Sequence, residues 1–404
     1  KLCYTVLALG DQTYEHFCKF GSDLDARLKS LGAVRICSRV ECDVELDVPF
    51  AQWKKELLAR LDAIATGNED PRSSEVAVVP VATNSAQSTT HGREDPLLAA
   101  LVEKRALTRD VSSKLTLHLA FSIADSELHY EAGDACGVIA QNDPNLVAQI
   151  LEALKFNGEE QVELQKVGAA SLREALLHSL QITRLSRKMV QTYAAKGDCQ
   201  RLLNLLIPEQ QSHFEQYLHG RGLIDLITEY PGVLADAAEL VAMLPKLTPR
   251  LYALSSSPVA HAKAVHATVA VGRYRTHDRE RGGVCSTLLA DRTEVGDALP
   301  IYIQPNKKFR LPYAETPMIM IGPGTGIAPF RAFLHERRAL GATGRNWLFF
   351  GERSAATDFL YREELKSMMA DRHLTRLDTA FSRDQERKIY VQDRMTEQSR
   401  NFWS

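Results

Sequence analysis

The sequence predicts a multidomain protein that combines α/β and β parts, and three regions of its 404 residues carry this prediction. Residues 1–65 read as strand, loop, helix, strand and helix, which is half of a doubly wound parallel sheet. From Pro96 onward the pattern turns to short alternating strands, which are typical of an antiparallel sheet or barrel. Residues 316–333 combine a buried strand, a glycine-rich turn and a helix. About two to three domains are expected at this length.

The composition is that of a soluble globular protein and disfavours several classes of partner. Hydrophobic residues make up 45% and charged residues 25% of the chain. A net charge of −2 gives no indication of a nucleic-acid or membrane-surface partner, and no apolar run is long enough to span a bilayer. Seven cysteines without a Cys-x-x-Cys pair favour a reducing, cytoplasmic compartment and no metal site. The first ten residues do not read as a signal peptide.

The first 95 residues predict a partial sheet followed by a linker. Strands are expected over 2–9 and 34–40, and a second helix over 50–65. The first helix is predicted from apolar residues with helical spacing, namely Phe20, Leu24, Leu28 and Leu31. Residues 66–95 are rich in Ser, Thr, Asn, Gly and Pro. Such a linker lets one domain swing relative to another, although a plain domain boundary fits the composition equally well.

The middle of the chain predicts an antiparallel part that is interrupted by helices. Strands are expected over 99–107, 114–123 and 133–139, and a long helical stretch over 143–247. Arg250-Leu251-Tyr252-Ala253 follows, and here a guanidinium and an aromatic ring alternate along a strand. Arg250 could therefore bind a pyrophosphate while Tyr252 packs against a ring. Gly283 opens a helix whose backbone N–H groups could meet the same pyrophosphate. The alternative is that Arg250 and Tyr252 are ordinary surface residues.

The last part of the chain predicts a nucleotide site. The strand over 317–321 leads into Gly322-Pro323-Gly324-Thr325-Gly326 and a helix, an arrangement that presents N–H groups to a phosphate. Ser382 and Arg383 follow a strand over 377–381 directly. Lys388 and Tyr390 are one alternation apart, so they would share a face of an extended segment. Together these side chains suit an adenosine that carries an extra phosphate. The alternatives are an ordinary turn and a solvated basic loop.

At this point the sequence resembles a known family. The segments GPGTGIAPFRAF, NWLFFGERSAATDFLYREEL and FSRDQERKIYVQ are similar to the NADPH-binding domain of the ferredoxin–NADP⁺ reductase superfamily, and more narrowly to diflavin reductases such as sulfite reductase flavoprotein subunits. The resemblance implies a flavodoxin-like FMN domain over 1–65, a linker over 66–95 and a Rossmann-like NADPH-binding domain over 314–404. Between them it implies an FAD-binding antiparallel β-barrel over 96–140 and 250–313, with a helical connecting domain inserted over 141–249.

The resemblance also implies three sets of binding residues and no catalytic residue or metal ligand. For FAD they are Thr183, Arg250, Leu251, Tyr252, Ala253, Thr268, Val269, Ala270, Tyr274, Gly283, Val284, Cys285 and Ser286. For NADP they are Gly324, Thr325, Ser382, Arg383, Lys388, Ile389, Tyr390, Val391 and Gln392. For FMN they are Leu9, Gly10, Asp11, Gln12, Thr13, Tyr14, Glu15, His16, Phe17 and Cys18, with Tyr14 as the stacking candidate.

The chain departs from the family pattern at three points. Ala253 stands where the family has a serine. No phosphate-binding loop precedes Leu2, and neither a Cys-Gly-Asp strand nor a terminal aromatic follows the basic segment; Trp403 does not take the place of that aromatic. We therefore expect both ends to be truncated and FMN binding to be doubtful in this chain.

The implied function is electron transfer from NADPH through FAD and FMN to a metalloprotein partner. For a sulfite reductase flavoprotein, that partner is a sirohaem and iron–sulfur subunit. A general haemoprotein reductase shares the same motifs. The third alternative is a flavin- and nucleotide-binding module without efficient turnover, which the truncated ends and Ala253 favour.

Overall fold

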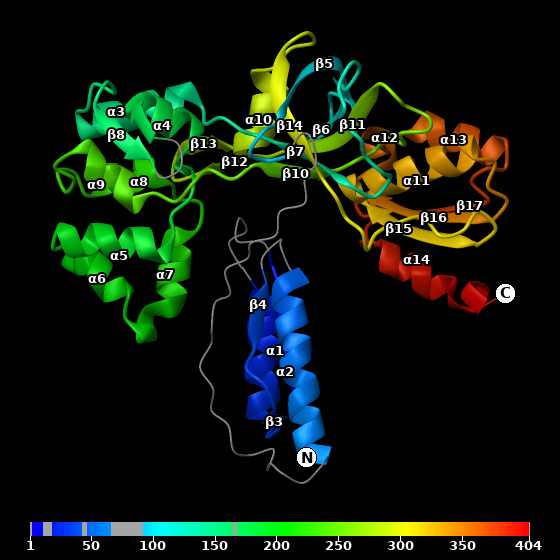
Figure 1. Ribbon diagram of the computed structural model, residues 1–404, viewed down its shortest axis with the longest axis horizontal. Coiled ribbons are helices and arrows are strands. Elements are labelled where there is room, and N and C mark those ends of the chain that lie inside the picture. The colour runs from blue at the N-terminus through cyan, green and yellow to red at the C-terminus, as the bar shows by residue number, and fades with distance from the viewer. Residues whose placement is uncertain (1, 11–17, 43–46, 66–91, 165–167, 404) are drawn as a thin grey trace. The chain divides into compact units, whose positions relative to one another are not determined.

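The computed structural model describes residues 2–10, 18–42, 47–65, 92–164 and 168–403 (Figure 1). The chain divides into two compact units, residues 1–88 and 89–404. Within the described residues, no helix is both long and apolar enough to cross a membrane.

In the first unit, blue in Figure 1, the described residues form two short parallel strand pairs and two helices. The pairs are β1 (Cys3–Tyr4) with β3 (Val34–Arg35) and β2 (Leu7–Leu9) with β4 (Val40–Cys42), and the helices are α1 (Lys19–Ser30) and α2 (Asp47–Ala65). The parallel β-α-β-α order confirms the prediction. The two predicted strands are each divided, however, because Tyr4 is opposite Arg35 whereas Leu7 is opposite Val40. Between the two strand pairs, residues 36–39 lie opposite residues 5–6, so one side has two more residues than the other and the pairing is interrupted there.

The predicted helix α1 is present, but of the apolar residues that predicted it only Leu28 is partly buried against the core. Phe20, Leu24 and Leu31 are 81%, 40% and 66% exposed, and the buried residues of the helix are Gly21 and Asp25. Gly21 lies against β2, since a Cβ atom there would stand 2.3 Å from that of Ala8. A close backbone approach of this kind accepts only glycine.

Asp25 can be buried because several donors satisfy its carboxylate. The Tyr4 hydroxyl donates to it at 3.0 Å, and the guanidinium groups of Arg35 and Arg39 donate from the neighbouring segment. Burial opposes the charged form, but these contacts outweigh burial and lower the pKa of Asp25. Pairing of a buried charge thus decides which face of α1 turns inward.

The second unit begins with an antiparallel sheet of six strands in the order β10-β7-β14-β5-β6-β11. The strands are β5 (Leu97–Ala106), β6 (Leu115–Ser122), β7 (Ala135–Val138), β10 (Arg250–Ala253), β11 (Ala264–Val271) and β14 (Ala298–Gln304). Its two edge strands approach each other, because Leu254, directly after β10, forms a bridge with Ala267 of β11. The hairpin of β12 (Arg273–Thr276) and β13 (Arg279–Gly282) leads to α10 (Val284–Asp291), which packs on the core of this sheet.

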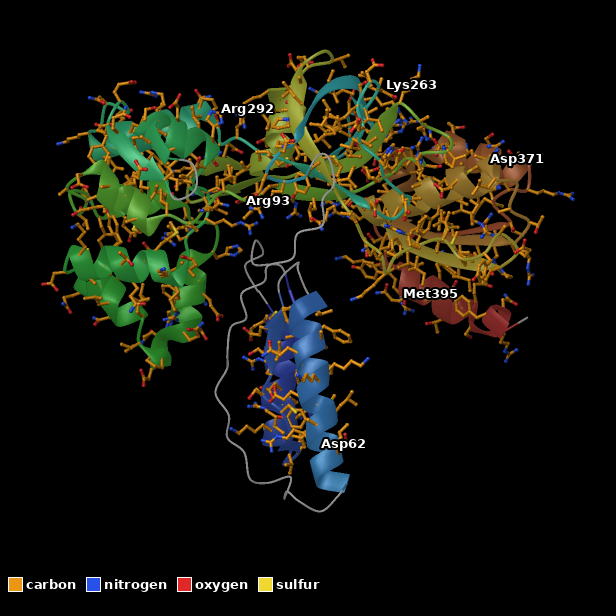
Figure 2. All side chains as sticks on the ribbon, in the orientation of Figure 1. Asp62, Arg93, Lys263, Arg292, Asp371 and Met395 are labelled. Atoms are coloured by element: carbon orange, nitrogen blue, oxygen red, sulfur yellow. The ribbon has the colours of Figure 1, made fainter. Side chains whose placement is uncertain are left out.

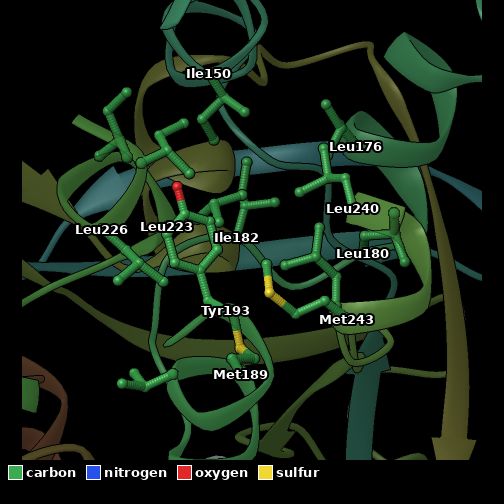
Figure 3. Packing of buried hydrophobic residues seen from close by; sticks show 14 of the residues in the cluster. Ile150, Leu176, Leu180, Ile182, Met189, Tyr193, Leu223, Leu226, Leu240 and Met243 are labelled. Carbon is green, nitrogen blue, oxygen red and sulfur yellow. The ribbon is translucent and has the colours of Figure 1, made fainter. Parts of the chain in front are cut away.

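A helical part is inserted between β7 and β10, as predicted. Its helices are α3 (Pro144–Leu154), α4 (Leu172–His178), α5 (Arg187–Lys196), α6 (Gln200–Leu205), η1 (Pro208–Gln210), α7 (Gln211–Leu218), α8 (Leu223–Glu229) and α9 (Ala237–Met243). They enclose a separate apolar core that includes Ile150, Tyr193 and Leu223 (Figure 3). The stretch is not wholly helical, because β8 (Gln161–Leu164) and β9 (Gly168–Ser171) form a hairpin that was not predicted.

Two arginine side chains connect this helical part to the antiparallel sheet and to its hairpin β12–β13. Arg292, labelled in Figure 2, donates to the carbonyls of Gln141 and Asn142 at 2.8 and 2.9 Å. Arg281 of β13 donates to both carboxylate oxygens of Asp225 at 2.8 Å, and Asp225 also accepts from the backbone N–H of Gly222 at the start of α8. The hairpin is therefore held against the N-terminus of α8.

The C-terminal part is built on a parallel three-stranded sheet, β15 (Met318–Pro323), β16 (Asn346–Glu352) and β17 (Arg376–Phe381). The helical segments are η2 (Gly324–Gly326), α11 (Ile327–Ala339), α12 (Ala355–Asp358), α13 (Arg362–Ala370), α14 (Val391–Glu397) and η3 (Ser399–Trp403). The strand, turn and helix predicted over 316–333 are confirmed. The extended segment expected at Lys388 and Tyr390 ends there: Tyr390 has extended backbone, with φ −118° and ψ 172°, α14 begins at Val391, and the carboxylate of Asp393 accepts the Tyr390 N–H at 2.8 Å.

Candidate functional site

The three strands of the C-terminal sheet end at one edge, where the predicted nucleotide residues lie. Pro323 pairs with Gly351, and Glu352 pairs with Phe381, so the three carboxyl ends are in register. Backbone pairing continues past the strands, because Ser382 N–H donates to Glu352 O at 2.9 Å. The turn after β15 and the basic loop after β17 therefore open onto the same edge, as parallel α/β ligand sites do.

The glycine-rich turn needs its glycines for steric reasons. A Cβ atom at Gly322 would stand 2.7 Å from the Phe330 ring and 2.8 Å from the Gly326 carbonyl oxygen. Gly324 has a φ of 57°, a conformation that favours glycine. Gly326 precedes α11, and no side chain caps the N-terminus of that helix. The N–H of Ile327, the first residue of this 13-residue helix, already donates to the carbonyl oxygens of Gly324 and Thr325, and Pro329 has no N–H, so only a few donors at this helix start are left for an anion.

The basic loop presents its predicted side chains to solvent. Ser382 is half-buried, whereas Arg383, Lys388 and Gln392 are exposed. Tyr390 is 45% exposed. Val391 packs under the strand ends, since a Cβ atom at Gly351 would stand 2.8 Å from it. The charged residues of the predicted NADP set can therefore reach a ligand at this edge without breaking buried contacts.

Two cations at the same edge were missed by the sequence reasoning. Lys114, at the start of β6 in the antiparallel sheet, forms an ion pair with Glu352. Arg353 follows Glu352, and its guanidinium donates to the Ser113 hydroxyl at 2.8 Å. The Glu352 side chain is 4% exposed and lies 3.4 Å from where a Cβ atom of Gly324 would stand. No local pattern marks Lys114, because its partner is 238 residues away in the chain.

The two predicted FAD motifs meet at one end of the antiparallel sheet. Arg250, Leu251 and Tyr252 are half-buried in β10, and Ala253 at its end is exposed. Burial, together with neighbouring Cys285 of α10, raises the pKa of the Tyr252 hydroxyl above its usual range. Burial also raises the pKa of the Cys285 thiol, to about 11, so this thiol is a neutral packing partner. The structure thus brings the strand motif and the helix motif together.

The backbone at the start of α10 is partly occupied. Gly283 N–H donates to Gly272 O at 3.0 Å, and the Ser286 hydroxyl accepts the Gly272 N–H at 3.1 Å. A Cβ atom at Gly283 would stand 2.6 Å from that hydroxyl oxygen. Gly283 therefore holds the junction between β11 and the helix, and its own N–H is not available to a phosphate. Of the predicted set, the N–H groups of Val284 and Cys285 remain for that role.

The other predicted FAD residues point in different directions. Val269 is buried in the sheet core, whereas Ala270 and Tyr274 are exposed. The Thr268 hydroxyl is buried and lies 2.6 Å from the Tyr361 hydroxyl of the C-terminal part. Thr183 lies in the helical part. Its carbonyl oxygen is close to Gly222, because a Cβ atom at Gly222 would stand 2.9 Å from it. Gly222 in turn donates its N–H to Asp225, which binds Arg281 of the hairpin β12–β13.

The predicted FMN loop is only partly described. Leu9 is exposed, Gly10 N–H donates to Cys42 O at 2.9 Å, and Cys18 is buried with its thiol 3.3 Å from Ala8 O. Both ends of the loop thus lie at the carboxyl ends of β2 and β4. The residues that lie outside the described part are Asp11, Gln12, Thr13, Tyr14, Glu15, His16 and Phe17.

Comparison with known proteins gives three domain families in the order of the sequence. Residues 1–53 match the flavodoxin family, residues 90–288 the FAD binding domain family, and residues 320–402 the oxidoreductase NAD-binding domain family. These ranges contain the three sets of predicted site residues, including Thr183 within the FAD family match.

Similar proteins carry the same combination. The chain is 42% identical over 400 residues to the "Sulfite reductase [NADPH] flavoprotein alpha-component" of Bacillus subtilis, covering 98% of this chain and 65% of that protein. It is also 42% identical over 406 residues to the protein of the same name from Photorhabdus laumondii, covering 99% of this chain and 66% of the relative. The chain therefore spans just under two thirds of the length of these relatives. The chain thus carries matches to the flavodoxin, FAD binding domain and oxidoreductase NAD-binding domain families in this order, and it is similar over nearly its whole length to sulfite reductase flavoproteins.

Proposed function

We propose that the chain is the part of an NADPH-dependent flavoprotein reductase that receives electrons from NADPH. The observation that carries the proposal is the contact between Lys114 and Glu352, which places the antiparallel sheet against the carboxyl edge of the C-terminal sheet. The two candidate cofactor sites thus belong to parts of the molecule that touch. When bound, FAD supplies a ring that accepts a hydride from NADPH and releases electrons singly.

On the nucleotide side, the chain's own groups fit a phosphorylated dinucleotide. Gly324, Thr325 and the N-terminus of α11 would hold the pyrophosphate through backbone N–H groups. Ser382, Arg383 and Lys388 would bind the 2′-phosphate, so we expect a preference for NADPH over NADH. Ile389, Tyr390, Val391 and Gln392 would line the adenosine, with the exposed Tyr390 ring as its stacking surface.

On the flavin side, the groups around β10 and α10 fit a second dinucleotide. Arg250 and the N–H groups of Val284 and Cys285 would bind its pyrophosphate, and the Tyr274 ring would pack on an aromatic group. The exposed ends of β10 and β11, at Ala253 and Ala270, would border the flavin ring. Thr268 and Ser286 contribute through their backbone, because their hydroxyl groups already have protein partners. Thr183, Leu251, Tyr252, Val269 and Gly283 complete the proposed set.

The electron acceptor follows from the relatives. Their names identify flavoprotein components of sulfite reductase, so the proposed partner is a sirohaem and iron–sulfur subunit, reached through FMN in the intact protein. A binding module without efficient turnover is the second candidate. It is favoured by Ala253, whose methyl group cannot donate the hydrogen bond that a serine offers in the family.

Anaerobic mixing of the FAD-loaded chain with NADPH tests the proposal. We expect NADPH to bleach the flavin absorbance, and NADH to do so with an efficiency lower by a factor on the order of a hundred. In the intact protein loaded with both FMN and FAD, addition of a sirohaem subunit should then restore the oxidised spectrum faster than cytochrome c does. A flavin that stays oxidised while NADP⁺ still binds would favour the module instead. Faster reoxidation by cytochrome c would favour a general haemoprotein reductase.

A further inference from the structure

Arg331 connects α11 to the antiparallel sheet. It lies five residues after Gly326 and is 5% exposed. Its Nε and Nη2 atoms donate to the two carboxylate oxygens of Glu364 in α13 at 2.8 and 2.9 Å. Its Nη1 atom donates to the carbonyl oxygen of Ser255 at 2.6 Å. The guanidinium also stands over the Tyr361 ring, 4.8 Å from the ring centroid. One side chain thus connects the C-terminal part to the antiparallel sheet.

The carbonyl that Arg331 reaches belongs to the candidate flavin strand. Ser255 comes two residues after Ala253, the last residue of β10. Its backbone N–H donates to His266 O in β11 at 2.8 Å, so it also holds the two edge strands together. Arg331 therefore joins the helix that follows the glycine-rich turn to the two strands that border the proposed flavin site.

Like Arg331, Tyr361 connects the C-terminal part to the antiparallel sheet, and we call each of these two connections a tie. Its hydroxyl lies 2.6 Å from the Thr268 hydroxyl of β11 and 3.0 Å from Nδ1 of His118 in β6. Its φ of 54° is rare for a non-glycine residue and persists only where the surroundings hold it. Tyr361 directly precedes α13, which carries Glu364, so the two ties share one rigid element.

The charges around Arg331 support a fixed geometry. Burial would raise the pKa of Glu364, but the hydrogen bond with His335 and the charge of Arg331 outweigh it and hold the pKa at about 2. His266 beside the guanidinium is neutral, because burial, His261 and Arg331 lower its pKa to about 3. The Arg331 side chain is 6% exposed and the Glu364 side chain 25% exposed, so water screens this charged pair less than it screens a pair on the surface.

We propose that Arg331 is a positioning residue that sets the distance between the glycine-rich turn and the flavin strand β10. The inference rests on the proposed function. Hydride transfer needs the two reacting rings in near-attack geometry, and a displacement of about 1 Å can cost about a hundredfold in rate. A guanidinium can bind a carboxylate with two N–H groups and still reach a carbonyl with a third. A lysine ammonium at the same place keeps the charge and loses that geometry.

Arg337 offers a matched control in the same helix. It is 2% exposed and donates to the carbonyl oxygens of Thr316 and Gly344 at 3.0 and 2.9 Å. Among the described residues, its hydrogen-bond partners are carbonyl oxygens of residues 313–344, and none of them belongs to a strand of the antiparallel sheet. Arg331→Lys and Arg337→Lys therefore remove comparable buried contacts, but only the first of these substitutions touches the antiparallel sheet.

The test compares flavin reduction in the FAD-loaded chain and its variants by anaerobic stopped flow. We expect Arg331→Lys to slow reduction by NADPH about ten- to a hundredfold. Its FAD content and its Kd for NADP⁺ should stay within about twofold of the unchanged chain. Arg337→Lys should lower the thermal midpoint and leave the reduction rate per bound FAD unchanged. Glu364→Gln provides a second variant that weakens the same tie, and it should slow reduction in the same direction.

Hydrogen exchange of the flavin-free chain gives a readout that does not depend on turnover. We expect the Ser255 amide, which is bonded to β11, to lose protection at least tenfold in Arg331→Lys and to keep it in Arg337→Lys. Absence of flavin reduction in the unchanged chain would overturn the proposed function, while the exchange experiment would still test the tie. If the unchanged chain is active, equal reduction rates in Arg331→Lys and the unchanged chain would overturn the inference. Equal losses in Arg331→Lys and Arg337→Lys would also overturn it.

Discussion

At the scale of single residues, arginines divide into those that hold the fold and those that can meet a ligand. Arg331 and Arg337 are buried, and each donates to carbonyl oxygens of the protein. Arg383, by contrast, is exposed at the edge where the strands end. An exposed arginine contributes little to stability. Its removal should therefore change binding and leave the fold intact.

Arg383→Ala should weaken NADP⁺ binding about tenfold and leave NAD⁺ binding nearly unchanged. A charge-assisted hydrogen bond to a phosphate contributes about 1.5–3 kcal/mol, and solvent screening at an exposed site reduces this contribution. Isothermal titration of the FAD-loaded chain with both nucleotides measures the effect. Arg338→Ala is the control, because Arg338 pairs with Asp371 near the opposite end of α11. Equal losses for NADP⁺ and NAD⁺ would contradict the assignment of Arg383 to the 2′-phosphate.

Ala253→Ser should speed flavin reduction by NADPH about two- to tenfold. The exposed end of β10 has room for a hydroxyl group, and one additional hydrogen bond contributes about 0.5–1.5 kcal/mol. Stopped-flow reduction at saturating NADPH measures the change. Ala253→Val adds bulk without a hydroxyl and should not speed the reaction. An equal gain from valine would show that packing and not hydrogen bonding is responsible.

At the scale of elements, the strand–turn–helix unit of residues 318–339 depends on close backbone approach. The turn folds back on α11, so that Gly322 has the Phe330 ring on one side and the Gly326 carbonyl on the other. A side chain at Gly322 must displace one of them. Gly326 lies in the same turn, but the nearest atom to a Cβ there, in Pro323, is 3.8 Å away.

Gly322→Ala should lower the free energy of unfolding by about 1–3 kcal/mol, as overpacking does, and should weaken NADP⁺ binding as well. Gly326→Ala should leave stability unchanged or raise it slightly, because its φ of −60° suits any residue. Urea unfolding followed by circular dichroism gives both values. A Gly322→Ala variant as stable as the unchanged chain would mean that the turn relaxes freely.

At the scale of the whole second unit, a polar and buried contact joins its six-stranded antiparallel sheet to the C-terminal part. His118 and His266 face Tyr361, Arg331 and Glu364 across this contact. Burial and the charge of Arg331 lower the pKa of His118 to about 2, and burial with nearby positive groups lowers that of His266 to about 3. Both rings are therefore neutral in the folded protein at pH values where an unfolded histidine is already charged.

The second unit should lose stability as the pH falls from about 6.5 towards 3. In this window both histidines bind protons in the unfolded chain but not in the folded protein. Each histidine therefore lowers the free energy of unfolding by up to about 1.4 kcal/mol for each unit by which the pH falls. Urea unfolding at pH 7, 6 and 5 measures the slope. His118→Asn should flatten it, whereas exposed His129→Asn should not. A slope that neither histidine variant changes would assign the acid sensitivity to other groups.

Local patterns in the sequence determined the elements that carry the candidate sites. The apolar run before Gly322, the alternation of Arg250 and Tyr252 and the glycine before α10 each act within one strand or one helical turn. Steric and hydrogen-bonding preferences at that range are properties of the residues themselves. The strand ends and helix starts could therefore be predicted, and with them the edge at which Ser382 and Arg383 lie.

Only the tertiary structure decided which side chains work together. It turned Asp25 of α1 inward in place of Phe20, because Arg35 and Arg39 neutralise the buried carboxylate. It joined Arg331 to Ser255 across 76 residues and Lys114 to Glu352 across 238. Burial and pairing of charges depend on atoms that chain folding brings together, and no periodicity in the sequence records those partners.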